Sequence, residues 1–211
     1  GVAWMKGKIM PINEASLPLN DWGLTRSDIT YDVVPVINGA FFRLNDYLNR
    51  FESSMKDMRL DPKLSRVEIQ KALTDMVSVS GLRDSYVSMV CSRGVPKVAG
   101  SRNPKDCDNH FFAWCVPYVN IIKPEIAKEG ASAWISDKVK RIPEDSVNPR
   151  NKNYHWGDLT KGLFEAKDND AETVILIDQN NFVTEGPGFN VFAVKDNVVI
   201  TPKHGVLEGI S

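Results

Sequence analysis

The chain has 211 residues, of which 42% are hydrophobic and 25% charged, values typical of a globular protein with a real core. Its 26 basic and 27 acidic residues leave a formal net charge of −1, so no global field predicts binding to nucleic acid or to an anionic membrane. No apolar run approaches the roughly 20 residues that span a bilayer, and no signal-peptide pattern opens the chain.

The first region, residues 1 to about 118, is predicted to form strands, then two helices, then strands. The helix expected over 45–58 carries apolar side chains on one face at helical spacing, namely Tyr47, Leu48, Phe51, Met55 and Met58. The next helix begins with the capping box Ser65 to Glu68 and ends at Gly81, with Ile69, Leu73, Met76 and Val77 inward. Strand-like runs follow at 86–91 and 111–116.

The second region follows a connection at residues 119–130. We expect a strand near 132–136, a helix over 156–167, and two hairpins: 174–177 turning at 178–180, and 190–194 turning at 196–197. The prediction is therefore an α+β chain of two domains, residues 1–120 and 121–211. The last residues, 205–211, form a glycine-flanked turn of the kind that opens a helix, so we expect a further C-terminal part of the fold.

Few motifs in the chain can carry chemistry. The three cysteines form no C-x-x-C pair and the three histidines have no metal-ligand spacing, so we expect no disulfide framework, no metal site and a cytoplasmic location. Three patterns remain: Lys152 ahead of a helix, Glu185 at a strand end before Gly-Pro-Gly, and the turn 205–211. Each alone has an ordinary explanation, respectively a solvated surface charge, a simple turn and a helix cap.

Together these patterns indicate pyridoxal phosphate (PLP) chemistry. That chemistry needs a lysine for a Schiff base, an acid that keeps the pyridine nitrogen protonated, and backbone N–H groups with a cation around the phosphate. Glu185 would supply the acid, the turn 209–211 part of the phosphate site, and Arg50 the cation, because it lies beside the buried stripe of its helix. The alternatives for Arg50 are snorkelling to solvent and pairing with a helix carboxylate.

Five ordered blocks make the sequence similar to a known family. It resembles the class-IV (fold-type IV) PLP enzymes, which include branched-chain aminotransferases, D-amino-acid aminotransferases, aminodeoxychorismate lyases and (R)-selective amine transaminases, the last being most similar. The similarity runs from Trp4 through Ser211. Its most specific blocks are 27–33, 42–46 followed by Arg50, 152–153 with 156–159, 184–186 with 188–190, and 205–210.

The resemblance implies a two-domain, D-amino-acid-aminotransferase-like α+β fold, with PLP at the domain interface of a homodimer. It makes Lys152 the Schiff-base lysine and proton shuttle, and Glu185 the partner of the pyridinium. It makes Arg50 a phosphate ligand, Ile210 and Ser211 backbone donors to the phosphate, and Tyr31 a lining residue of the substrate pocket.

The sequence departs from the family at three places. Arg26 stands where the amine transaminases commonly have a histidine, and Ala99 where some members place a mobile arginine that binds a substrate carboxylate. The usual threonine-glycine phosphate loop is absent. We hypothesise that Arg26 takes over recognition of the carboxylate in the substrate pocket.

The expected function is transamination between an amine or amino acid (branched-chain, D-amino acid or (R)-amine) and a keto acid, in a ping-pong cycle through Lys152. The alternatives are a lyase that eliminates pyruvate from an aminodeoxychorismate-like substrate, a degenerate PLP-binding chain, and a plain interaction domain. The substrate, the stereochemistry and the partner of the cofactor's phenolate oxygen stay open. Gly157 occupies the position of the tyrosine that serves this oxygen in branched-chain aminotransferases.

Overall fold

The computed structural model describes all 211 residues, Gly1–Ser211. The chain divides into two compact units. The first comprises Gly1–Val119 together with Asn151–Tyr154, and the second comprises Asn120–Arg150 together with His155–Ser211. The short segment 151–154, which carries Lys152, therefore belongs with the first unit although it lies within the second region of the sequence. That these units are the two domains of the family stays a prediction.

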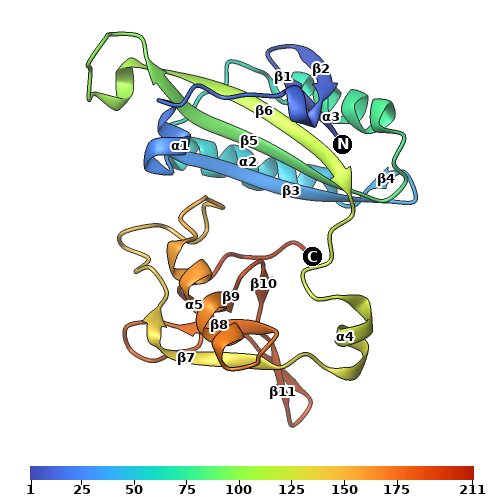
Figure 1. Cartoon of the computed structure of the whole chain (residues 1–211), viewed down its shortest axis with the longest axis vertical. Helices are drawn as coiled ribbons and strands as arrows, with labels where there is room; N and C mark the ends of the chain where they lie inside the picture. Colours follow the sequence, from blue (N-terminus) through green and yellow to red (C-terminus); the bar gives the residue numbers. More distant parts are fainter. The chain divides into compact units, whose positions relative to one another are not determined.

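A six-stranded antiparallel sheet forms the centre of the first unit (Figure 1). Its spatial order is β2-β1-β6-β5-β3-β4, and its strands are β1 (Val2–Met5), β2 (Lys8–Pro11), β3 (Ile29–Ile37), β4 (Ala40–Phe41), β5 (Ser85–Pro96) and β6 (Cys107–Pro117). β3 is rich in β-branched residues, which favour strands. It tolerates Pro35 because β4 pairs only with its last residues, so the missing N–H lies near a sheet edge.

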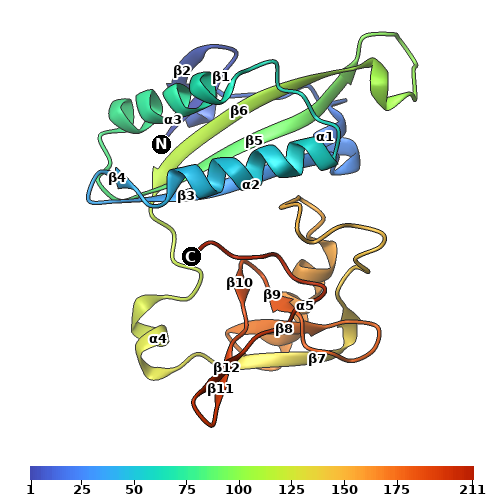
Figure 2. The ribbon, with the colours of Figure 1, turned by 180° about the vertical axis from the view of Figure 1, so that it is seen from behind.

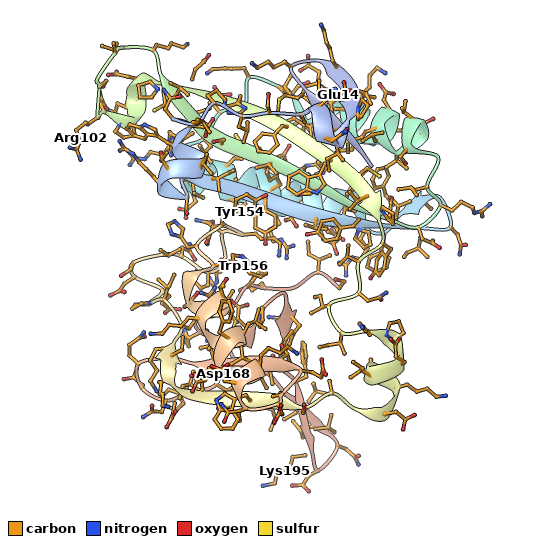
Figure 3. The ribbon with its side chains drawn as sticks, viewed as in Figure 1. Glu14, Arg102, Tyr154, Trp156, Asp168 and Lys195 are labelled. Carbon is orange, nitrogen blue, oxygen red and sulfur yellow. The ribbon has the colours of Figure 1, made fainter.

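The long hairpin of β5 and β6 extends well beyond the predicted runs 86–91 and 111–116. The pairing shifts register between Ser92 and Val95. Gly94 lies in this bulge with a φ of 77°, and a Cβ there would lie 2.0 Å from the Asp108 carbonyl oxygen, so only glycine fits. The loop at the far end contains a short 3-10 turn, Pro104–Asp106, next to Arg102, which Figure 3 labels.

Two helices, α2 (Leu44–Asp57) and α3 (Arg66–Ser80), cover one face of this sheet, as Figure 2 shows. Both predicted helices are confirmed, including the reciprocal capping box of Ser65 with Glu68 and the left-handed C-cap at Gly81. The predicted inward residues are buried, except that Met58 and Val77 are half-buried. The buried members are Tyr47, Leu48, Phe51, Met55, Ile69, Leu73 and Met76.

A second apolar cluster of the first unit gathers around Tyr31 on β3. Its buried members are Met5, Ile29, Tyr31, Val90 and Phe112, and Trp114 and Tyr154 pack against it. Tyr154, labelled in Figure 3, comes from the segment 151–154, which is bridged to β3 through the pair Thr30 and Asn153. The chain enters β3 through a 3-10 turn, Ile12–Glu14, and a short helix, α1 (Trp22–Arg26).

The second unit is built on two parallel strands and the helix between them. β7 (Ala133–Lys140) pairs in parallel with β8 (Thr173–Ile177), and α5 (Gly157–Asp168) packs on both through Leu159 and Ala166. The strand predicted near 132–136 and the helix predicted over 156–167 are both present. A short helix, α4 (Pro124–Glu129), lies in the predicted connection.

The reversal predicted after 174–177 is present. Asp178 N donates to the Phe182 carbonyl at 2.9 Å, Thr184 N donates to the Leu176 carbonyl at 3.0 Å, and Ile177 forms an antiparallel bridge with Val183. The sequence did not predict that β8 also pairs in parallel with β7. β8 is a continuous apolar run, mostly buried, as is typical of a parallel strand covered by a crossover helix.

The second predicted hairpin is confirmed. β11 (Ala193–Lys195) pairs with β12 (Val198–Ile200), and Lys195 stands near its tip in Figure 3. The two turn residues, Asp196 and Asn197, have φ values of 50° and 59°, as a tight hairpin turn requires. Upstream, β9 (Glu185–Gly186) pairs with β10 (Phe189–Asn190). None of the helices of the structure is both long and apolar enough to cross a membrane.

Candidate active site

Lys152 is held in the first unit by its main chain. Its carbonyl oxygen accepts a hydrogen bond from the backbone N–H of Tyr31 at 3.0 Å and another from Thr30 Oγ1 at 2.7 Å. The neighbouring Asn153 is buried and bridges to the same strand. The backbone of the lysine is thus fixed to the start of β3, while its side chain is half-buried.

The Tyr31 ring lies beside the Lys152 side chain, and the Tyr154 ring packs against Tyr31. The Nζ atom is 4.9 Å from the centroid of the Tyr31 ring, and this ring lies 4.5 Å from that of Tyr154 in a tilted contact. Burial raises the pKa of the Tyr154 phenol, and the nearby Tyr86 raises it further, so Tyr154 is a neutral phenol at physiological pH. The structure therefore places Tyr31 next to the lysine, and its role as a lining residue of the substrate pocket stays a prediction. Tyr154 received no role from the sequence.

Arg50 forms a two-pronged ion pair with Asp32. Its Nε and Nη2 atoms donate to the two carboxylate oxygens at 2.8 and 2.7 Å, and the Asp32 side chain is fully buried. The guanidinium, 15% exposed, also lies 5.5 Å from the centroid of the Tyr47 ring. Its carboxylate partner therefore comes from a strand and not from its own helix. Its role as a phosphate ligand stays a prediction, and Asp32 fixes the orientation from which Arg50 would act.

Arg26 ends α1, and its guanidinium carbon lies 3.3 Å above the centroid of the Trp22 ring. The residue is exposed, so its charge faces solvent. The next residue, Ser27, has a φ of 54°, and then Asp28 forms a paired contact with the buried Arg93 at 2.9 and 3.1 Å. The segment that presents Arg26 is therefore anchored on both sides.

The other anchor of this segment is the buried Asp21. Its carboxylate caps α1 through Gly23 N at 2.7 Å and contacts Ser92 Oγ at 2.5 Å and His110 Nε2 at 2.7 Å. Burial alone would raise the pKa of Asp21, but the hydrogen bonds from His110, Ser92 and Gly23 outweigh it, and the pKa is lowered. The ionised carboxylate is therefore the form that holds α1 to the sheet.

Glu185 is a buried carboxylate in the second unit with both oxygens occupied. Oε1 accepts from Arg141 Nε at 3.1 Å and Nη2 at 3.0 Å, and Oε2 accepts from the backbone N–H of Leu207 at 3.0 Å. The next residue, Gly186, must be glycine because a Cβ would lie 2.6 Å from the Val174 carbonyl oxygen. The chain after Glu185 therefore packs directly against the backbone of β8.

Arg141 extends this contact into a cluster of three charges. Its Nη1 donates to Asp158 Oδ2 at 2.6 Å, and Ile142 N donates to the same oxygen at 2.8 Å. The side chains are 11% (Arg141), 7% (Asp158) and 9% (Glu185) exposed. The sequence predicts no role for Arg141 or Asp158, because the contacts of Arg141 join residues 17 and 44 positions apart in the chain.

The terminal turn meets the Glu185 block in the same unit. Leu207 N donates to Glu185, and Asn190 Nδ2 donates to the Leu207 carbonyl at 2.8 Å. Ile210 is half-buried and Ser211 exposed. Two of the blocks singled out in the sequence therefore lie together, whereas the predicted roles of Ile210 and Ser211 as phosphate donors stay predictions.

The Glu185 cluster fits the cofactor that the resemblance implies. One guanidinium (+1) and two carboxylates (−2) leave a net charge of −1 in a nearly buried site. An unbalanced buried charge is costly, so the cluster favours one further cation. A carboxylate offers about four acceptor positions and Glu185 uses three, which leaves one for a protonated ring nitrogen.

Comparisons with known proteins bear on the whole chain. The family model for amino-transferase class IV matches residues 30–211. A putative branched-chain-amino-acid aminotransferase of Methanocaldococcus jannaschii is 28% identical over 211 residues, covering 99% of this chain and 71% of the relative. A D-alanine aminotransferase of Bacillus licheniformis is 26% identical over 201 residues, covering 92% of this chain and 66% of the relative.

The fold also matches solved structures. The crystal structure of a branched-chain amino acid aminotransferase from Thermobaculum terrenum, in its PLP-bound holo form, superposes with a TM-score of 0.79 at 26% identity. The match covers 99% of this chain and 69% of that chain.

Proposed function

The chain belongs to the class IV amino-transferase family, and from this premise we propose that it binds PLP and transfers an amino group from an amine or amino acid to a keto acid. The predicted family and the predicted α+β fold class are confirmed, as is the enzyme class at the level of the family. The use of PLP is supported by the PLP form of the Thermobaculum structure.

The observation that carries the proposal is the net negative cluster around Glu185. When bound, PLP supplies an electron-withdrawing ring that stabilises negative charge at the substrate carbon, and it does so best with its ring nitrogen protonated. Glu185 would accept the hydrogen bond of that nitrogen and keep the proton there. The fixed carboxylate needs no reorientation during the reaction, because its oxygens are already held by Arg141 and Leu207.

Lys152 would attach the cofactor covalently through Nζ and afterwards move a proton at the substrate carbon. Its main chain is held by Tyr31 and Thr30, so the movement falls to the flexible side chain. The Tyr31 ring lies 4.9 Å from Nζ and packs against the Tyr154 ring, so the amine would move beside an aromatic surface.

The phosphate and the substrate would be bound by the remaining predicted residues. Arg50, oriented by Asp32, would contact the phosphate, with the backbone N–H groups of Ile210 and Ser211 as further donors. Tyr31 would line the substrate pocket. Arg26 would attract a carboxylate, which favours amino acids and keto acids over simple amines.

The proposed substrates are amino acids and keto acids, which carry a carboxylate. The relatives described above are named for branched-chain amino acids and D-alanine, both of which carry a carboxylate. The greater similarity to (R)-selective amine transaminases that the sequence indicated stays a prediction. We propose a homodimer, as the resemblance implies, and a cytoplasmic location, as the cysteine pattern predicts.

A direct assay separates this function from its alternatives. The PLP-loaded protein is incubated with L-leucine, D-alanine or an (R)-amine, with and without 2-oxoglutarate or pyruvate, and amino and keto products are quantified by chromatography. Transamination predicts equal amounts of both products only when donor and acceptor are present. Release of pyruvate from aminodeoxychorismate without an acceptor would identify the lyase, and PLP binding without any product would identify a degenerate chain.

A further inference from the structure

Arg141 and Asp158 complete the buried ion cluster around Glu185. We propose that Arg141 and Asp158 are positioning residues for Glu185. Arg141 orients the carboxylate, and Asp158 keeps the net charge of the cluster negative so that Glu185 can bind a cation. The inference rests on the proposed function, because that cation is the protonated ring nitrogen of PLP.

Arg141 is fixed at both ends. Its backbone N–H donates to the Ile177 carbonyl at 2.9 Å, and its carbonyl accepts from Gln179 Nε2 at 2.7 Å. At the other end, the planar guanidinium directs Nε and Nη2 to Glu185 and Nη1 to Asp158. A planar fork tied on two sides cannot rotate without breaking a buried ion pair, so the direction of the Glu185 carboxylate is set by this contact.

Asp158 is held independently of Arg141. It lies in the first turn of α5, where the helix dipole favours a negative charge. Backbone N–H groups of Leu159 and Ile142 donate to its oxygens at 2.7 and 2.8 Å. Its charge and position therefore persist whether or not Arg141 contacts Glu185.

The charge of Asp158 decides what Glu185 can do. With Asp158 ionised, the three groups sum to −1; without that charge, Arg141 and Glu185 cancel to zero. At exposures of 7 to 11%, solvent screens these charges weakly, so the difference is felt by a cation bound at Glu185. Asp158 thus acts through Glu185, without touching the cofactor.

The test uses Asp158→Asn in the full-length protein, with Glu165→Gln as the matched control. Glu165 is a carboxylate of the same helix that accepts a hydrogen bond from Ser136 Oγ outside the cluster. For each variant, the PLP dissociation constant is measured by titrating the cofactor-free protein, and the absorption band of bound PLP is followed against pH. Thermal unfolding of each protein checks that it is folded.

We expect Asp158→Asn to weaken PLP binding at least about tenfold and to move the pH midpoint of the absorption band to lower pH, because a cation loses one neighbouring negative charge. Glu165→Gln should match the wild type in both. In a Glu185→Gln background, Asp158→Asn should add little, since its effect passes through Glu185. Should Asp158→Asn fail to fold, Arg141→Lys keeps the charge sum but loses the fork, and kcat should fall with the pH midpoint unchanged.

An Asp158→Asn variant indistinguishable from Glu165→Gln would overturn the inference. So would an undiminished effect of Asp158→Asn in the Glu185→Gln background, or an Arg141→Lys variant with wild-type kcat. These outcomes differ from a failure of the proposed function, in which the wild-type protein itself would not bind PLP.

Discussion

The neighbourhoods of Lys152 and Glu185 are built in opposite ways. Lys152 is anchored through its carbonyl oxygen, by Tyr31 and Thr30, and its side chain lies beside the Tyr31 ring. Glu185 is anchored through its side chain, by three N–H donors within a buried ion cluster. With its main chain held, Lys152 keeps a long side chain that can move. With its carboxylate held, Glu185 presents an immobile charge.

The largest effect on activity is expected at Lys152, whose side chain can move. Lys152→Ala should lower transamination by roughly a thousandfold, because it removes the group that moves the proton. Steady-state kinetics with the best donor and acceptor measures it, with Lys161→Ala, an exposed lysine of α5, as control. Near wild-type turnover in Lys152→Ala would contradict the proton-transfer role of Lys152.

The second largest effect on activity is expected at Glu185, whose carboxylate is fixed. Glu185→Gln keeps the shape but removes the charge, so kcat should fall by roughly a hundredfold while Lys152 still attaches PLP. Rapid-mixing measurement of the half-reaction with a single donor gives the rate. A half-reaction rate in Glu185→Gln equal to that of the wild type would contradict the role of Glu185, and loss of covalent attachment at Lys152 would contradict the separation of the two roles.

The buried pair of the first unit is expected to serve stability as well as binding. Asp32→Asn removes the buried carboxylate charge that pairs with Arg50 and should lower the free energy of unfolding by about 3 kcal/mol. Urea unfolding measures this. Asp46→Asn, which removes an exposed pair with Arg43, should cost under about 1 kcal/mol. Equal losses in the two variants would show that the Arg50 contact has no special strength.

A smaller and selective effect is expected at Arg26. Arg26→Ala should reduce kcat/KM for pyruvate by about tenfold, the loss expected for one charge-assisted contact, and leave a carboxylate-free ketone unaffected. The two acceptors are compared in wild type and variant with the same donor. An equal loss on both acceptors would show that Arg26 does not recognise the carboxylate.

The smallest effect concerns pH and Asp21. A carboxylate with a lowered pKa in the folded state stabilises the fold above its unfolded value, 3.8, and this contribution is lost as pH falls through the folded pKa. Asp21→Asn should therefore be less stable than the wild type at neutral pH, with the gap closing in acid. Unfolding free energies between pH 2 and 7 test this, and a gap independent of pH would contradict it.

The helices of the first unit could be predicted because their signals are local. The capping box at Ser65, the apolar stripe from Tyr47 and the hairpin turn at Asp196-Asn197 all depend on residues close in sequence. The parallel pairing of β7 with β8 could not, because a buried apolar run such as 173–177 does not specify its partner.

For the candidate site too, local sequence patterns could be predicted and long-range contacts could not. Lys152 and Glu185 could be proposed because each lies in a distinctive local run, and Tyr31 because its block matches the family. Arg141 carries no local signal at all, and its importance comes from contacts with Asp158 and Glu185 that only the fold creates.

The central claim is that Lys152 carries the cofactor. The PLP-loaded, full-length protein is reduced with borohydride, digested, and the pyridoxyl adduct located by peptide mass mapping. We expect a single adduct on Lys152, present in wild type and in Glu185→Gln and absent from Lys152→Ala. An adduct on another lysine, or none in a protein that binds PLP, would contradict it.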